Sequence, residues 1–116
     1  MFPLRAALVL ALLSSPAAAD DWQVLKGADI TLALTARVLA YPGGQTQNFY
    51  ADGRTLYETD HPQWGHWRVE GDRYCSVWPP SDRWSCYGVD REAQGLDLRF
   101  VDDAGTATQG RYVDLK

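Results

Sequence analysis

One stretch of the chain constrains its folding more than any other: residues 75–86, which read CSVWPPSDRWSC. The segment is nearly a palindrome, with a serine beside each cysteine and a tryptophan on each side of the Pro-Pro pair. This pattern is typical of two antiparallel strands in which like residues pair across a turn. A four-residue loop at 79–82 would produce four cross-strand pairs: Trp78 with Arg83, Val77 with Trp84, Ser76 with Ser85, and Cys75 with Cys86.

This register predicts a disulfide between Cys75 and Cys86. Directly opposed residues at a non-hydrogen-bonded position have Cα atoms about 4.5 Å apart, a spacing that a disulfide accepts. Closing a loop of this length contributes on the order of 3 kcal/mol in the chain-entropy model. The alternative is a redox-active pair, but catalytic dithiols usually lie two residues apart beside a helix N-terminus. Ten residues intervene here, so we expect a structural crosslink.

The N-terminus has the pattern of a secretory signal peptide. One basic residue, Arg5, precedes an apolar run at 6–13, and the small residues 17–19 follow Pro16. We therefore expect export to the periplasm, with residues 1–19 removed by cleavage near Ala19/Asp20. The apolar run is shorter than the roughly 20 residues that span a bilayer, so no membrane anchor is expected.

The remaining segment, residues 20–116, is long enough for a single small domain. Without Arg5 it carries ten Lys and Arg against fifteen Asp and Glu. The two signs are interspersed and no basic run occurs, so nucleic acid is not an expected partner.

A short helix is predicted near the start of this domain, over residues 29–36. Asp29 is a suitable N-cap, and Ile30, Ala33, Leu34 and Arg37 share one face at helical spacing. From Val38 onward, short aromatic and β-branched runs alternate with turn signals every eight to twelve residues, which is typical of small antiparallel β proteins.

Two turns set the expected strand registers. The Asp52-Gly53 pair predicts a two-residue hairpin turn that places Phe49 opposite Leu56 and Tyr50 opposite Thr55. The Gly71-Asp72 pair predicts a second such turn, with Val69 opposite Tyr74 and Trp67 opposite Ser76.

Further strands are expected within 95–101, where Leu96, Leu98 and Phe100 share a face, and within 106–115, with Tyr112 inside. The predicted fold is mainly β: an antiparallel meander sheet or a partly closed small β-barrel, with one short N-terminal helix and one disulfide.

No residue pattern points to catalysis. His61, His66 and Asp60 offer too few ligands for a zinc site, and no serine lies in a Gly-x-Ser-x-Gly elbow. The acidic residues show no spacing that singles out a catalytic pair. We expect neither an enzyme nor a cofactor, and no metal site.

The chain is rich in aromatic residues, with five tryptophans and six tyrosines. Trp67, Tyr74 and Tyr87 are expected on one face of the central hairpins, and Trp84 on the other face beside the disulfide. The apolar patch on this second face is either covered by the helix and N-terminal segment or is a binding surface. Its candidate binding residues are Trp78, Pro79, Pro80, Arg83 and Trp84.

Residues 65–75, together with Trp78, Cys86 and Tyr87, resemble a family of short exported proteins of Gram-negative bacteria that has no assigned activity. Its members share a Gly-x-Trp-x-Val strand, a Gly-Asp turn and two cysteines that flank a Trp-containing loop. The resemblance covers about residues 27–113 and implies periplasmic location and a helix-plus-β architecture. The chain is more distantly similar to small periplasmic lysozyme inhibitors, but it lacks their Ser-Gly-x-x-Tyr loop.

From these features we expect an exported accessory protein that binds a periplasmic protein or a cell-envelope glycan through its Trp/Pro hairpin. The alternative expectation is an inhibitor of an envelope enzyme such as lysozyme.

Overall fold

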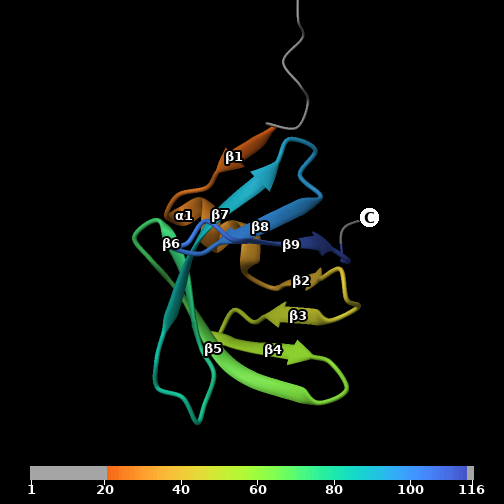
Figure 1. Cartoon of the computed structure of the whole chain (residues 1–116), viewed down its shortest axis with the longest axis vertical. Coiled ribbons are helices and arrows are strands. Elements are labelled where there is room, and N and C mark those ends of the chain that lie inside the picture. The colour runs from red at the N-terminus through yellow and green to blue at the C-terminus, as the bar shows by residue number, and fades with distance from the viewer. Residues whose placement is uncertain (1–20, 115–116) are drawn as a thin grey trace, which may run out of the picture.

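The computed structural model describes residues 21–114, which form a mainly β structure with one short helix (Figure 1). The predicted signal peptide lies outside the described residues. No helix within 21–114 is long and apolar enough to cross a membrane. The elements are β1 Trp22–Val24, α1 Ala28–Leu34, β2 Arg37–Ala40, β3 Thr46–Phe49, β4 Arg54–Glu58, β5 Pro62–Glu70, β6 Arg73–Val77, β7 Ser85–Glu92, β8 Asp97–Val101 and β9 Ala107–Tyr112.

Strands β2 to β9 form a closed antiparallel barrel in which each strand pairs with the next along the chain. Pairing between β2 and β9 closes the ring, with Leu39 opposite Tyr112 and Ala40 opposite Arg111. The short strand β1 pairs with the C-terminal half of β7. The predicted meander is confirmed, and its closure is complete because β9 returns to β2.

Helix α1 packs into the interior of the barrel through the three residues predicted from helical spacing, Ile30, Ala33 and Leu34, all of them buried. The Tyr112 hydroxyl donates to the Ala33 carbonyl oxygen at 2.6 Å, which ties the helix to the closing strand. The N-cap prediction was wrong: the N-cap is Gly27, and Asp29 lies in the first turn without a side-chain capping bond. The helix starts at Ala28, one residue before the predicted start, because the Ile30 N–H donates to the Gly27 carbonyl oxygen.

The helix also ends earlier than predicted. Ala36 has a φ of 59°, a left-handed conformation that stops a helix. Its N–H donates to the Phe49 carbonyl oxygen at 2.8 Å, so the chain enters the sheet here. Arg37 therefore belongs to β2, and its predicted place on the helical face was wrong.

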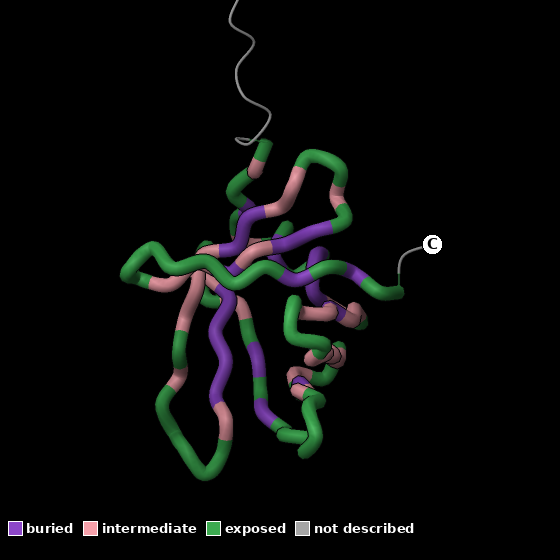
Figure 2. Tube along the Cα trace, turned by 45° about the vertical axis from the view of Figure 1, so that its right-hand side comes forward, coloured by how far each residue is buried: buried purple, intermediate pink, exposed green. Residues whose placement is uncertain are grey.

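Aromatic rings fill the middle of the barrel. Phe49 makes edge contacts with Trp67 and Tyr74, each with ring centroids 5.8 Å apart, and lies 6.4 Å from Phe100. Figure 2 shows the buried residues along the strands that face this interior. Trp67, Tyr74 and the partly buried Tyr87 belong to this cluster, so the predicted core face of the central hairpins is confirmed.

The Gly71 turn has the predicted register, with Val69 opposite Tyr74 and Trp67 opposite Ser76. The register of the Asp52-Gly53 turn differs from the prediction by one residue, because Phe49 pairs with Thr55 rather than with Leu56. A type I′ turn needs positive φ at both central residues, but only Gly53, at 90°, has it. The loop thus has three residues, and the Gly53 N–H donates to the Tyr50 carbonyl oxygen.

This one-residue difference changes the interior, since side chains alternate between the two faces of a strand. Thr55 faces inward and is fully buried, while Leu56 is only partly buried. In the C-terminal part, Leu98, Phe100 and Tyr112 are buried as predicted, whereas Leu96 precedes β8 and is exposed. Strand β9 ends at Tyr112, and Leu115 lies outside the described residues.

Candidate functional site

The predicted binding loop joins β6 to β7 and forms the lower tip of the molecule in Figure 1. The ladder between these strands contains the predicted pairs Cys75–Cys86 and Ser76–Ser85 and ends there. The predicted pairs Val77–Trp84 and Trp78–Arg83 were wrong, because residues 78–84 are loop rather than strand. A turn in which the Ser81 N–H donates to the Trp78 carbonyl oxygen, and a cis Pro79–Pro80 bond, shape this longer loop.

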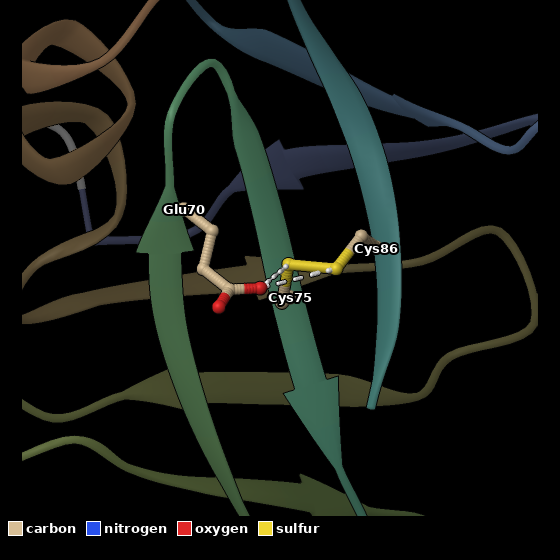
Figure 3. Close-up of side chains that lie close together, drawn as sticks. All are labelled: Glu70, Cys75 and Cys86. Atoms are coloured by element: carbon tan, nitrogen blue, oxygen red, sulfur yellow. Dashed lines mark hydrogen bonds between the residues drawn. A yellow bond between two sulfur atoms is a disulfide. The ribbon is translucent and has the colours of Figure 1, made fainter. Parts of the chain in front are cut away.

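The disulfide between Cys75 and Cys86 is present, with Cα atoms 4.0 Å apart across the β6–β7 pair. Cys75 is fully buried. Figure 3 shows Glu70 pointing at the two sulfurs from β5, with its Oε2 atom 3.3 Å from the Cys75 Sγ atom. Disulfide sulfurs carry no proton, so this is a close contact rather than a hydrogen bond.

Within residues 21–114, Glu70, Cys75 and Cys86 are the one group of three potential metal ligands that lie together. Both sulfurs are joined to each other, and a metal site needs them as free thiolates. The carboxylate instead pairs with Arg68, whose Nη2 atom lies 3.0 Å from the Glu70 Oε1 atom.

The two tryptophans of the loop point to different places. Trp84 lies on the outer face, where the Arg68 guanidinium sits 3.8 Å from the centre of its ring. Trp78 lines a cavity at the mouth of the barrel. Pro79, Pro80 and Arg83 are exposed at the tip between them. The helix, which was one predicted cover for this patch, packs its buried face against the core of the barrel instead.

The cavity has a volume of about 640 Å³. Its walls come from strands on all sides of the barrel, which is where small eight-stranded barrels hold a ligand. Aromatic and amide side chains predominate, and within the described residues no lining side chain is charged. The lining residues are Tyr41, Pro42, Gln45, Gln47, Tyr57, Gln63, Tyr74, Ser76, Trp78, Tyr87, Phe100 and Thr108.

A polar network centred on Gln47 lies at the inner end of this cavity. The Tyr41 hydroxyl donates to the Gln47 Oε1 atom at 2.6 Å. The Gln47 Nε2 atom donates to the Thr55 Oγ1 atom at 3.0 Å and to the Tyr74 hydroxyl at 3.2 Å. Thr55 in turn donates to the Asn48 carbonyl oxygen. These contacts hold both ends of the buried Gln47 amide in one orientation.

The phenol groups of this network stay protonated at neutral pH. Burial raises the pKa of Tyr74 to about 12, although hydrogen bonds from Ser76 and Gln47 oppose the rise. Burial and the neighbouring tyrosines Tyr74 and Tyr57 raise the pKa of Tyr41 still further. The cavity therefore offers neutral hydroxyl and amide groups rather than charges.

Trp78 is held against one wall of the cavity. Its indole Nε1 atom donates to the Ser76 Oγ atom at 3.3 Å, and its ring meets Tyr57 edge-on at 6.2 Å between centroids. The ring occupies the space where residue 65 would carry a side chain, since a Cβ built on Gly65 would lie 2.6 Å from the Trp78 Cε3 atom.

The sequence prediction found Trp78 but missed the other residues around the cavity, above all Tyr41, Gln47 and Tyr57. One signal pointed to them: Gln47 alternates with buried Phe49 in β3, so a polar side chain occupies a position that faces the core. A buried amide of this kind needs partners, and its partners define the inner end of the cavity.

Comparisons with protein-family models, curated proteins and solved structures gave no match to this chain. Membership of the exported family that its sequence resembles stays a prediction.

Proposed function

We propose that this protein is an exported, periplasmic binding protein whose barrel mouth holds a sugar ring of a cell-envelope glycan. The observation that carries the proposal is the uncharged cavity of about 640 Å³, lined mainly by tyrosine, tryptophan, glutamine and hydroxyl side chains.

The chemistry of the lining fits a saccharide. Aromatic rings provide flat apolar surfaces for the C–H faces of a sugar, and they lose little conformational entropy on binding. Amide and hydroxyl side chains are both donors and acceptors, as sugar hydroxyls are. The volume lies within the range of about 300–1,000 Å³ that is usual for small-molecule sites.

The disulfide supports the same function from outside the cavity. It joins the strands directly next to the loop that carries Trp78, which limits how far that wall of the cavity moves. A disulfide also persists in oxidising compartments, in agreement with the signal-peptide pattern and a periplasmic location.

Tryptophan fluorescence tests the proposal directly. Titration with peptidoglycan disaccharide fragments should change the emission of the native protein in a saturable way. Trp78→Ala should weaken binding at least about tenfold because it removes a cavity wall. Trp84→Ala is the matched control on the outer face, and it should leave the affinity unchanged. An unchanged spectrum at saturating fragment would contradict the proposal, and equal losses in both variants would show that binding is not confined to the cavity.

A second candidate function, inhibition of an envelope enzyme such as lysozyme, is favoured by one observation. The β6–β7 loop projects beyond the neighbouring hairpins (Figure 1), Pro79 and Pro80 in it are exposed, and the disulfide anchors its base. A rigid exposed loop of this kind suits insertion into an enzyme cleft. An inhibitor should slow lysozyme in a turbidity assay of cell-wall lysis, and no effect at high molar excess would exclude this function.

A further inference from the structure

We propose that the cavity selects sugars that carry an N-acetyl group, with the Tyr74 hydroxyl donating to the acetamido carbonyl oxygen. This inference rests on the proposed function and names the ligand class that the inner end of the cavity accepts.

The first step is the direction of the hydrogen bonds around Gln47. Tyr41 donates to the Gln47 Oε1 atom, so the other end of the amide, Nε2, is the one that faces Thr55 and Tyr74. The Tyr74 oxygen therefore accepts a proton from Gln47. The Ser76 hydroxyl also hydrogen-bonds this phenol and lowers its pKa, as a donor to the phenol oxygen does. The Ser76 Oγ atom in turn accepts from the Trp78 indole. With Gln47 and Ser76 as donors, the proton of the Tyr74 hydroxyl is left for a ligand.

The second step is the location of that proton. Tyr74 is buried, with 4 % of its surface exposed, and it lines the cavity. A buried hydroxyl proton needs an acceptor, and a ligand in the cavity that Tyr74 lines can supply one. Because the phenol stays neutral, it is a donor for an uncharged oxygen atom. A carbonyl oxygen is a stronger acceptor than a sugar hydroxyl.

The third step is the apolar surface next to this donor. The ring of Phe100, which also lines the cavity, lies 5.0 Å from the Tyr74 ring between centroids. A ligand group that fits here combines an acceptor oxygen with a small apolar group directly beside it. The acetamido group does so, since its methyl packs on Phe100 while its carbonyl accepts from Tyr74.

The fourth step is the charge of the site. Within residues 21–114, no side chain that lines the cavity is cationic and could pair with a carboxylate, sulfate or phosphate, and burying an unpaired anion is costly. Trp78 and Tyr57, in edge contact at 6.2 Å, form the aromatic wall for the sugar ring itself. The site thus favours neutral N-acetylhexosamines over charged sugars.

Two disaccharides with the same β-1,4 linkage separate the possibilities: N,N′-diacetylchitobiose, which carries acetamido groups at C2, and cellobiose, which carries hydroxyls there. Calorimetric titration of the native protein should show about tenfold tighter binding of the acetylated sugar, the selectivity expected for one hydrogen bond plus a buried methyl. Tyr74→Phe removes only the hydroxyl, so it should bring the two affinities within about threefold of each other. Tyr50→Phe is the matched control, because Tyr50 stacks on Trp64 outside the cavity lining.

Each outcome decides the question. Binding of both sugars with equal affinity, or selectivity that Tyr74→Phe leaves intact, would overturn the N-acetyl inference while the proposed saccharide function stands. Absence of binding by either disaccharide and by the peptidoglycan fragments would overturn the proposed function together with the inference. Circular dichroism and thermal unfolding of Tyr74→Phe establish that the variant is folded, since the Gln47 bond to Thr55 remains in place.

Discussion

At the scale of single residues, the position of Trp78 depends on the absence of a side chain at Gly65. Gly65 is buried in β5, and the Trp78 ring packs directly on its Cα. An added Cβ would lie 2.6 Å from both the Trp78 ring and the Val77 carbonyl oxygen. The carbonyl is backbone and cannot rotate away, so any side chain here displaces either the strand or the cavity wall.

Gly65→Ala should therefore destabilise the protein by about 1–3 kcal/mol, the usual range for overpacking. It should also shift the fluorescence of Trp78 and weaken the proposed saccharide binding. Thermal unfolding and fluorescence spectra measure both effects.

Gly88→Ala in β7 is the matched control, because the nearest atom to an added Cβ there is the Val101 carbonyl oxygen at 3.9 Å. It should change stability by less than about 1 kcal/mol. Equal losses in the two variants would show that the effect at residue 65 does not arise from crowding of Trp78.

At the scale of secondary-structure elements, the β8–β9 hairpin is held by a buried carboxylate. Asp97 begins β8 and accepts from the Arg111 Nε atom at 2.7 Å and from the Gln109 Nε2 atom at 2.8 Å, both on β9. Asp97 is 5 % exposed. The hydrogen bond from Arg111 lowers the pKa of Asp97 below its usual value of 3.8. This hairpin also carries the strand that closes the barrel.

The stabilisation that this carboxylate provides should depend on pH. Because its pKa is lower in the folded than in the unfolded state, the full effect is present above about pH 5 and is lost as the pH falls below 3.8 towards the folded value. Asp97→Asn should reduce the melting temperature at pH 7, and the difference from the native protein should shrink at pH 3. Melting curves at the two pH values measure this, and a difference that stays constant would contradict the linkage.

At the scale of the whole molecule, the barrel has a closed end and an open end. Helix α1 closes one end of the barrel, where Ile30 and Leu34 are fully buried. The aromatic layer around Phe49 packs against these residues. Beyond that layer the interior becomes polar at Gln47 and opens into the cavity. The division resembles that of many ligand-binding barrels, in which a packed core at one end supports a site at the other.

Leu34→Ala should destabilise the barrel by about 2–5 kcal/mol, the cost of removing a fully buried leucine. Leu32, two residues away on the same helix, is 74 % exposed and provides the matched control. Leu32→Ala should change stability by less than about 0.5 kcal/mol. Chemical denaturation measures both, and a small loss at Leu34 would mean that the helix does not contribute to the core of the barrel.

Residue patterns predicted part of the candidate site and missed the rest for a physical reason. Trp78 stood out because it lies between the two cysteines of a nearly palindromic segment. Gln47 comes from β3 and bonds to Tyr74 of β6 because the sheet curves into a barrel, and Tyr41, just after β2, joins them through Gln47. Contacts between residues 27 or more positions apart leave no local pattern in a sequence.

The Asp52-Gly53 turn shows the same limit on a smaller scale. Glycine takes positive φ both in a two-residue turn and in a three-residue loop, so the dipeptide alone does not choose between them. Contacts of Trp67 favour the three-residue loop, since its backbone N–H donates to the Gly53 carbonyl oxygen and its indole donates to the Tyr50 carbonyl oxygen. The resulting register places Thr55 inside, where it becomes a partner of Gln47.

The sequence by itself determined what depends on neighbours along the chain: the buried face of the helix, the Gly71 turn, and the β6–β7 pairing that aligns Cys75 with Cys86. Spacing and turn chemistry are enough for these, because the interacting residues lie close together in the chain. Only the tertiary structure decided that the meander closes through Leu39 and Tyr112, and that Trp78 faces a cavity while Trp84 faces outward. Those features depend on the curvature and closure of the whole sheet, which arise from packing between distant strands.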